Sequence, residues 1–440
     1  MVSKKINNNW GYQDLMQYRI HEILLVSSPY DAFILEEDGK LTEQILSEYI
    51  GMNLSYAPRV WNAQSAKEAT EFINKRFFDV IIIMMRISDT DPIKFSQKIK
   101  KKYPKKPLVL LAFDQSELKD ISLHDQEIFD EIFIWSGNSN VFPAAIKSIE
   151  DKKNIAKDVK TADIRTVLFI EDNPRYYSSI LPVLYKEIIS NTKKLMDKSL
   201  NNSQKILHMR ARPKIILIKN YEKAIQYINR YRFNILGIIS DLRYPHKDNK
   251  NYLSGLKLVN YLKKIESAIP IILQTTEQNI PKELKESSVK IVKKDSSTLF
   301  KELQNFMIDE LGFGDFKLRS PYLKRIYKAK NIEELNKKIK NANIDSIKFH
   351  ASKNHISNWL ATRGEFDLAS SFRKLRRDDF KNFNERKKYY IKLLEKEKRV
   401  SNELKIVEFS KKINDFSHNF IQVGSGSLGG KARGLAFANK

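Results

Sequence analysis

Residues 166–172 read TVLFIED, a run of apolar and β-branched residues that stops at two adjacent acids. Four more short apolar runs follow it, with stretches of helical spacing such as 254–265 between them. These runs are KIILIK (214–219), ILGIIS (235–240), PIILQ (270–274) and VKIVK (289–293). Short apolar strands that alternate with amphipathic helices are typical of a parallel sheet covered on both faces. We therefore expect a five-stranded α/β unit, with one long helix from Tyr176 to about Leu207 after its first strand.

A similar pattern stands earlier in the chain. Its apolar runs are HEILLV (21–26), DVIIIMM (79–85), PLVLLAF (107–113) and EIFIW (131–135). The two halves form a degenerate internal repeat of about 145 residues. The sequence therefore predicts two five-stranded parallel α/β sheets in tandem.

Length and composition narrow the class of protein. At about 150 residues per domain, 440 residues predict about three domains. The absence of cysteine excludes disulfides, cysteine nucleophiles and thiolate metal sites. The first twenty residues have no apolar core, and the longest apolar runs, 80–85 and 108–113, are far shorter than the ~20 residues that span a bilayer. We expect a cytoplasmic protein with no membrane segment.

The chain is strongly basic, with 78 Lys and Arg, 53 Asp and Glu, and a net charge of +25. Such a charge suits nucleic acid or an acidic membrane surface. The basic residues are scattered along mixed-charge stretches, however, and do not form one run with interleaved aromatics. We interpret the charge as a solvated surface, and nucleic acid is not an expected partner.

The strands of the second half end in acidic, hydroxyl and lysine side chains. These strand ends form the sheet edge at which ligands bind in open parallel sheets. The side chains are Glu171 and Asp172 after the first strand, Asp241 after the third, Thr275 after the fourth, and Lys293 and Lys294 at the end of the fifth. Three carboxylates without thiols or histidines suit Mg²⁺. A lysine and a hydroxyl at the same edge suit phosphoryl oxygens. The edge predicts an aspartyl-phosphate site with Asp241 as the nucleophile.

These segments together resemble a response-regulator receiver domain: VLFIEDNPRYY (167–177), ISDLRYP (239–245), PIILQTTE (270–277) and VKKDS (292–296). The resemblance implies a flavodoxin-like, receiver-type fold and phosphorylation by a histidine kinase or a small phosphodonor. It assigns Mg²⁺ to Glu171 and Asp172 together with Asp241, which is the phosphoacceptor. It makes Thr275 the switch hydroxyl and Lys294 the phosphate contact. Lys293 is a near-equal alternative, because the end of the strand cannot be fixed to one residue.

The first half lacks this chemistry at the aligned positions. They carry Ser27 and Ser28, Met84, Ala112, and Trp135 or Ser136. We therefore expect a pseudo-receiver that serves as a scaffold or interaction module. Its apolar edge of Met84, Met85 and Trp135 is a candidate surface for a partner domain or a homodimer. Asp89 and Asp91 are expected in loops or helix caps.

After LGFGDF (311–316), the segments 331–342, 352–376 and 383–399 have helical spacing. We expect a mainly helical segment here. His350 and His355 are five residues apart, which places them off a common helix face. They are interpreted as surface or capping residues.

The chain finishes with GSLGGKARGLAF (426–437) before its last three residues. This segment resembles the opening of the ATP-grasp domain of phosphoenolpyruvate synthase and pyruvate phosphate dikinase. SSPYDAFILEEDG, MRARPKIIL and FHASKNHISNWLATRGEFDLA are similar to stretches that precede the PEP/pyruvate-binding domain in a bacterial dikinase-like family. The resemblance implies that Lys431, helped by Arg433, contacts ATP phosphates in a longer chain.

We therefore divide the chain into a leader (1–19), a pseudo-receiver (20–152), a receiver (163–311), a helical connector (312–420) and the truncated start of an ATP-grasp domain (421–440). The expected function is to regulate a phosphoenolpyruvate-synthase-like phosphotransferase. Its C-terminal PEP/pyruvate-binding domains would be partners in cis or in trans. By itself the chain is not expected to be a complete enzyme, and ATP is a cofactor only if the chain continues beyond residue 440.

Two alternatives stay open. One is a stand-alone response-regulator-like signalling protein with a basic, nucleic-acid-binding helical end. The other is a scaffold that is not phosphorylated.

Overall fold

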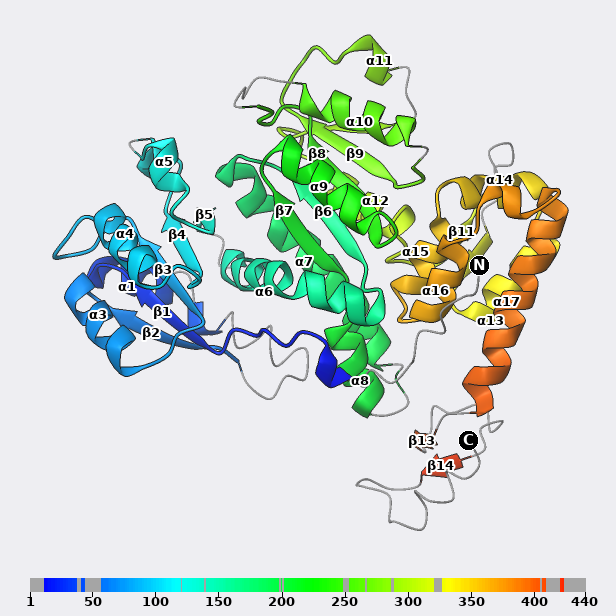
Figure 1. The fold of residues 1–440 in the computed structure, drawn as a ribbon, viewed down its shortest axis with the longest axis horizontal. Coiled ribbons are helices and arrows are strands. Elements are labelled where there is room, and N and C mark those ends of the chain that lie inside the picture. Colours follow the sequence, from blue (N-terminus) through cyan, green and yellow to red (C-terminus); the bar gives the residue numbers. More distant parts are fainter. Residues whose placement is uncertain are drawn as a thin grey trace.

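The computed structural model describes residues 12–37, 41–43, 57–119, 121–137, 140–197, 199, 202–247, 253–265, 267–285, 289–319, 327–403, 406–408 and 420–422. They form two parallel sheets followed by a mainly helical segment (Figure 1). The predicted fold class is confirmed. No helix among these residues has both the length and the apolar composition to cross a bilayer.

The first sheet has the order β2-β1-β3-β4-β5, and all its strand pairs are parallel. Its strands are β1 (Glu22–Val26), β2 (Arg59–Ala63), β3 (Val80–Met84), β4 (Leu108–Ala112) and β5 (Glu131–Ile134). Its helices are α1 (Pro29–Glu37), α3 (Ala66–Lys75), α4 (Pro92–Lys102), α5 (Leu123–Gln126) and α6 (Val141–Ala162), with 3-10 turns at Tyr12–Asp14 and Ser116–Leu118. The sequence did not indicate β2, because this edge strand reads RVWNA and is largely solvent-accessible.

The second sheet repeats the arrangement in the order β10-β9-β8-β6-β7, again fully parallel. Its strands are β6 (Thr166–Ile170), β7 (Lys214–Ile218), β8 (Ile235–Asp241), β9 (Ile271–Thr275) and β10 (Lys290–Lys293). Its helices are α7 (Pro174–Asp197), α8 (Asn202–Arg210), α9 (Tyr221–Tyr231), α10 (Ser254–Lys264), α11 (Lys282–Lys285) and α12 (Leu299–Asp309). Numbered within each unit, both orders are 2-1-3-4-5, the flavodoxin-like doubly wound order. The single helix expected over 176–207 is instead two helices, α7 and α8.

The helical segment begins with a short antiparallel pair, β11 (Phe316–Leu318) and β12 (Tyr327–Ala329). It continues with α13 (Ile332–Asn341), α14 (Ile344–Ser352), α15 (His355–Ala361), α16 (Phe366–Arg373), a 3-10 turn (Arg377–Asp379), α17 (Phe383–Glu403) and the parallel pair β13 (Ile406–Glu408) and β14 (Phe420–Gln422). The helix expected over 352–376 is broken, because Gly364 has a φ of +81°, which an α-helix cannot contain.

The two histidines of this segment are buried, so their interpretation as surface residues was wrong. The backbone N–H of Arg319 donates to His350 Nε2 at 2.8 Å, which leaves the proton of a neutral His350 on Nδ1. That atom lies 3.0 Å from His355 Nδ1, and His355 Nε2 lies 2.9 Å from Glu310 Oε2. Burial, followed by the neighbouring His355, lowers the pKa of His350 to about 2. The chain of bonds ties the helical segment to the end of α12.

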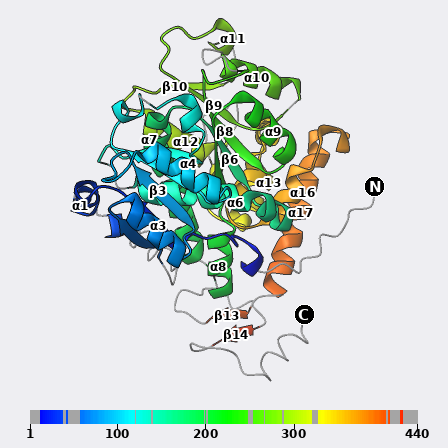
Figure 2. The same ribbon diagram turned by 60° about the vertical axis from the view of Figure 1, so that its left-hand side comes forward.

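Helix α6 joins the two sheets, since it contacts both β5 and β7 (Figures 1 and 2). The two units also protect each other's edge strands. Asp151 on α6 accepts the Ile215 N–H of β7 at 2.9 Å, and Ser178 Oγ on α7 accepts the Ile134 N–H of β5 at 2.9 Å. Because an open edge strand leaves backbone donors unpaired, these bonds fix the two units together.

The apolar edge of the first sheet is covered by the second unit. Met84 and Trp135 are 0% and 6% exposed and belong to the same core cluster as residues of α7. Phe133 on β5 meets the ring of Tyr177 edge-on, with 5.7 Å between centroids. Met84 and Trp135 are thus buried packing residues, as expected, but the domain they pack against is the second unit of the same chain. The expectation that this edge is open to a separate partner or to a second copy was wrong.

Part of the predicted leader belongs to the fold. Alternate backbone N–H groups of residues 16–20, at the end of the leader, donate to side chains one turn apart on α6, at 2.9–3.0 Å: Met16 to Asp158, Tyr18 to Asn154 and Ile20 to Glu150. The spacing of these N–H groups along the segment matches the spacing of the acceptors along the helix. Two residues of extended chain advance about 6.8 Å, and four residues of helix advance about 6 Å.

The junction contains a buried network of charges. Arg212 lies 2.8 Å from Asp151, and Lys214 lies 3.1 Å from Asp158. The hydroxyl of Tyr185 donates to Asp151 at 3.1 Å. Removing one member of a buried ion pair leaves its partner charged in a medium of low dielectric constant, which costs about 3–5 kcal/mol.

We predict that Asp151→Asn lowers the free energy of unfolding by about 3 kcal/mol or more, because the buried Arg212 loses its counter-charge, whereas Lys214 keeps Asp158. Urea denaturation followed by circular dichroism measures the change. The control is Glu71→Gln, which removes an exposed ion pair with Lys75 and should cost less than about 0.5 kcal/mol. Equal stability of the two variants would contradict the role assigned to the network.

Candidate functional site

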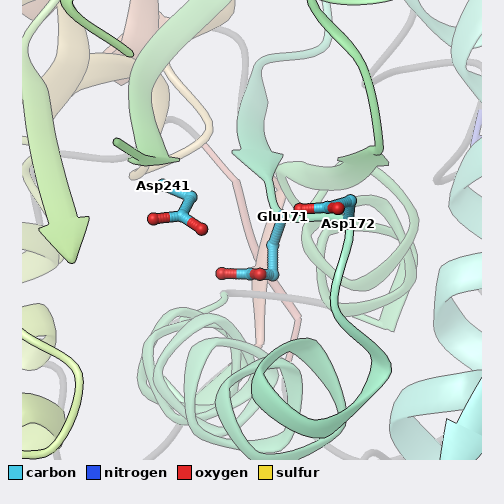
Figure 3. A group of neighbouring side chains, drawn as sticks. All are labelled: Glu171, Asp172 and Asp241. Carbon is cyan, nitrogen blue, oxygen red and sulfur yellow. The ribbon is translucent and has the colours of Figure 1, made fainter. Parts of the chain in front are cut away.

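Three carboxyl groups meet at the carboxyl edge of the second sheet. Glu171 and Asp172 directly follow β6, and Asp241 is the last residue of the neighbouring strand β8. One oxygen atom from each carboxylate lies within 4.8 Å of the other two. Figure 3 shows the three side chains gathered at the ends of the two strands.

A buried lysine lies between two of these acids. Lys294 Nζ is 2.6 Å from Glu171 Oε2 and 2.6 Å from Asp241 Oδ2. It also lies 4.2 Å from the centroid of the Tyr176 ring. Lys293 points elsewhere and donates to the backbone carbonyl of Glu277. Side chains alternate along an extended chain, so only one of the two adjacent lysines can face the acids, and it is Lys294.

Glu171 is completely buried, with 0% of its surface exposed. Its carboxylate accepts the Asn173 N–H at 3.2 Å and the Gln274 side-chain amide at 3.1 Å, in addition to Lys294. Burial raises the pKa of Glu171 to about 8; Asp241 adds to this rise and Lys294 opposes it. Lys294 is therefore the main group that opposes protonation of this carboxyl.

The environment of Asp241 is similar. Its Oδ1 accepts the Leu242 N–H at 2.6 Å, while Oδ2 faces Lys294. Burial raises the pKa of Asp241, and Lys294 again works against the rise. For Lys294 itself burial lowers the pKa, but Glu171 and Asp241 outweigh burial, so its pKa is raised. Each acid and the lysine thus stabilise one another's charged forms against the effect of burial.

Thr275 ends β9 at the same edge. The register pairs Gln274 with Asp241, and Lys293 with Thr275. The Lys294 N–H donates to the Thr275 carbonyl at 2.9 Å, and Thr275 Oγ1 accepts the Glu277 N–H at 3.0 Å. The structure thus brings every residue predicted for this site to one edge. The other two predicted site residues, Lys431 and Arg433, lie outside the described residues.

The residues at this edge fit Mg²⁺. All the candidate ligands are hard carboxylate oxygens, and Asp172 is only partly buried, so a path to solvent remains. Mg²⁺ prefers one or two carboxylates together with several waters. Lys294 now provides the positive charge between Glu171 and Asp241, and a bound metal ion would take over part of that neutralisation.

Two side chains of the site were missed from the sequence. Gln274 is a polar residue inside an otherwise apolar, buried strand, and that contrast was the available signal. Tyr176 lies on the first turn of α7, where the segment DNPRYY gave no reason to choose it over its neighbour Tyr177. Both contact the charged trio, Gln274 through Glu171 and Tyr176 through Lys294.

The matching edge of the first sheet is different. Ser27 follows β1, Met84 and Ala112 end β3 and β4, and Trp135 follows β5, so the aligned positions carry no acid. A buried carboxylate nevertheless lies nearby, which the sequence did not indicate. Asp31 Oδ1 is 3.7 Å from Arg86 Nη1, and Arg86 Nη2 is 3.3 Å from Glu117. At this edge the protein's own guanidinium group faces the acids.

Comparisons with known proteins find similarity at the level of structure. No protein-family model matches the sequence, and no curated protein matches it significantly. A response regulator receiver domain (CheY-like) from Methylobacillus flagellatus is 15% identical, with a TM-score of 0.21, and the match covers 26% of this chain and 86% of that one.

Two further solved structures are similar to the chain. A probable two-component system response regulator/GGDEF domain protein is 11% identical over 64% of this chain and 96% of its own, with a TM-score of 0.28. The receiver domain of a sensor histidine kinase from Pseudomonas aeruginosa, whose structure has a magnesium ion in its active-site cleft, is 13% identical over 29% and 94%, with a TM-score of 0.22. The fold assignment rests on the strand order of the two sheets.

We predict that Lys294→Met lowers the free energy of unfolding by about 3 kcal/mol at pH 8, because two buried carboxyl groups lose their shared counter-charge. The loss should shrink toward pH 5. Burial raises the folded-state pKa of Glu171 and Asp241 above the unfolded values, so protonation favours the folded variant. Urea denaturation at both pH values measures the effect.

The matched control is Lys293→Met, which changes the neighbouring lysine and touches neither acid. It should cost less than about 1 kcal/mol at either pH. If the two variants lost the same free energy with the same pH dependence, Lys294 would not be the group that holds the acids.

Proposed function

We propose that this protein is a signalling module whose second α/β unit is phosphorylated on Asp241 in a Mg²⁺-dependent reaction. The observation that carries the proposal is the placement of Lys294 Nζ at 2.6 Å from both Asp241 and Glu171, beside a third carboxylate. A metal ligand set, a nucleophile and a phosphate-binding cation are the components that phosphoryl transfer to a carboxylate requires.

The proposed reaction is the transfer of a phosphoryl group to the carboxylate of Asp241. One of its carboxylate oxygens attacks the phosphorus of the donor, which is a phosphohistidine of a histidine kinase or a small phosphodonor. The new bond joins that oxygen to phosphorus, and the leaving group departs with the electron pair of the bond that breaks. Lys294 neutralises charge on the phosphoryl oxygens, and the Thr275 hydroxyl supplies a further contact. Mg²⁺, when bound by Glu171, Asp172 and Asp241, supplies additional positive charge for the same oxygens.

Phosphorylation would also move the lysine. In the unphosphorylated protein Lys294 is shared by Asp241 and Glu171, and it lies against the Tyr176 ring. A phosphoryl group on Asp241 carries more negative charge than a carboxylate and attracts the lysine away from Glu171. Tyr176 lies in the first turn of helix α7, and the next two residues, Tyr177 and Ser178, form hydrogen bonds with β5 of the first unit. The signal therefore has a route through α7 to the first sheet.

We infer that the regulated partner is a phosphoenolpyruvate-synthase-like phosphotransferase with PEP/pyruvate-binding domains, attached in cis or acting in trans. The support is the resemblance of residues 426–437 to the start of an ATP-grasp domain. In this proposal the two α/β units and the helical segment form the regulatory part, and the catalytic groups are supplied by the partner domains.

The first test is to incubate the purified chain with acetyl phosphate and Mg²⁺ and to measure its intact mass. We expect the addition of one phosphoryl group to the wild type and to Asp295→Asn, which changes an exposed acid next to Lys294. Asp241→Asn should gain nothing, because an amide oxygen is a poor nucleophile for phosphorus. No addition to the wild type, or an equal addition to Asp241→Asn, would reject Asp241 as the phosphoacceptor.

The second test concerns the partner. We expect no pyruvate-dependent consumption of ATP by residues 1–440 alone. When PEP/pyruvate-binding domains are supplied on the same polypeptide or in trans, this activity should change on phosphorylation of Asp241. A phosphorylated module that leaves the rate of the added domains unchanged would disprove the assignment of the partner but leave the phosphorylation intact.

A further inference from the structure

A large cleft separates the second α/β unit from the helical segment. Its volume is about 1360 Å³. One wall comes from the amino edge of the second sheet, where Phe233 precedes β8 and Ile269 precedes β9. The other wall comes from α14, α16, α17 and the turn at 377–379. The cleft is therefore at the opposite edge of the sheet from Asp241.

The lining of this cleft is strongly basic. Six cationic side chains line it: Arg232, Lys264, Lys348, Arg373, Arg376 and Arg386. Only two carboxylates do, Asp345 and Asp378. Among the described residues, Lys348 is the one cation of the six that forms an ion pair, with Asp345 at 3.4 Å. The charge that faces the cleft is thus largely uncompensated.

Arg373 is the clearest case, because it is only 8% exposed. Its guanidinium donates to Asn358 Oδ1 at 3.1 Å and to the carbonyl of Ile235, which are both neutral acceptors. Burial, together with the nearby charges of Arg165 and Arg232, lowers the pKa of Arg373 to about 9. Buried charges in proteins are normally paired, so Arg373 beside Arg232 in the lining of this cleft indicates an anionic ligand.

Aromatic rings stand beside the cations. Phe233 lines the cleft with 56% of its surface exposed, although it lies two residues before a fully buried strand. Phe349 and Phe383 line the cleft as well, and Lys348 Nζ lies 5.7 Å from the centroid of Phe383. Phe349 and Phe383 are half-buried, so the exposed ring of Phe233 is the most accessible. Phenylalanines next to arginines and lysines are suited to stack on a base while the cations bind phosphates.

We propose that this cleft binds a nucleoside polyphosphate, with its phosphates on the arginine and lysine side chains and its base against the phenylalanines. The ligand would contact both the second α/β unit and the helical segment, so its binding would stabilise their present arrangement. The site shares no residue with the acidic edge, and the proposal does not depend on phosphorylation of Asp241.

The test is isothermal titration calorimetry of the 440-residue chain with ATP, GTP and tripolyphosphate, without Mg²⁺ and in about 150 mM salt. We expect one nucleotide per chain, with tripolyphosphate weaker than ATP because it has no base to stack. The double variant Lys348→Glu/Arg376→Glu should weaken ATP binding by about tenfold or more, since it reverses two charges at exposed positions of the cleft.

The control variant is Lys337→Glu, on the neighbouring helix α13, where an exposed lysine pairs with Glu333 much as Lys348 pairs with Asp345. It should bind ATP like the wild type, and thermal unfolding should show that both variants are folded. Absence of binding by all three ligands, or equal weakening by the control, would overturn the proposal. If tripolyphosphate bound as tightly as ATP, the proposed contact between the base and the phenylalanines would be disproved. If a short DNA duplex displaced ATP, the cleft would be identified as a nucleic-acid site instead.

Discussion

The candidate site depends on one buried cation held between two buried acids. Glu171 and Asp241 are the ends of neighbouring strands, and Lys294 contacts both carboxylates at 2.6 Å. Without the lysine, burial would favour the neutral acids, which bind neither metal nor phosphorus. With it, the charged forms of both carboxyl groups are stabilised beside Asp172. The same contact makes the arrangement sensitive to charge, because any group that adds negative charge at Asp241 competes with Glu171 for the lysine.

Much of the fold could be predicted, because its signals are local. Apolar runs such as 166–170 and 235–240 became fully buried strands, and Asp89 and Asp91, expected in loops or caps, do cap helices through their carboxylates. The same alternation of apolar strands and helices also predicted which side chains lie at the carboxyl edge of the second sheet. The choice between Lys293 and Lys294 could not be made from the sequence, because adjacent side chains of a strand point to opposite faces. An uncertainty of one residue in where the strand ends therefore exchanges the two lysines.

The contacts between units could not be predicted, because they join residues far apart in the sequence. Asp151 looks like an ordinary helix-surface acid, yet it accepts the backbone N–H of Ile215 and pairs with Arg212. His350 is buried because Arg319 and His355 satisfy both its nitrogens. Met84 and Trp135 correctly looked like a packing surface, but they are buried in a core that they share with α6 and α7 of the same chain.

The most direct test of the account is a crystal structure of the protein with Mg²⁺ and beryllofluoride, which mimics a phosphoryl group on aspartate. We expect beryllium on an Asp241 oxygen, a metal ion among the carboxylates of Glu171, Asp172 and Asp241, and Lys294 Nζ hydrogen-bonded to fluorine. A structure in which Asp241 is unmodified and Lys294 still bridges it to Glu171, although both reagents are present in excess, would contradict the account.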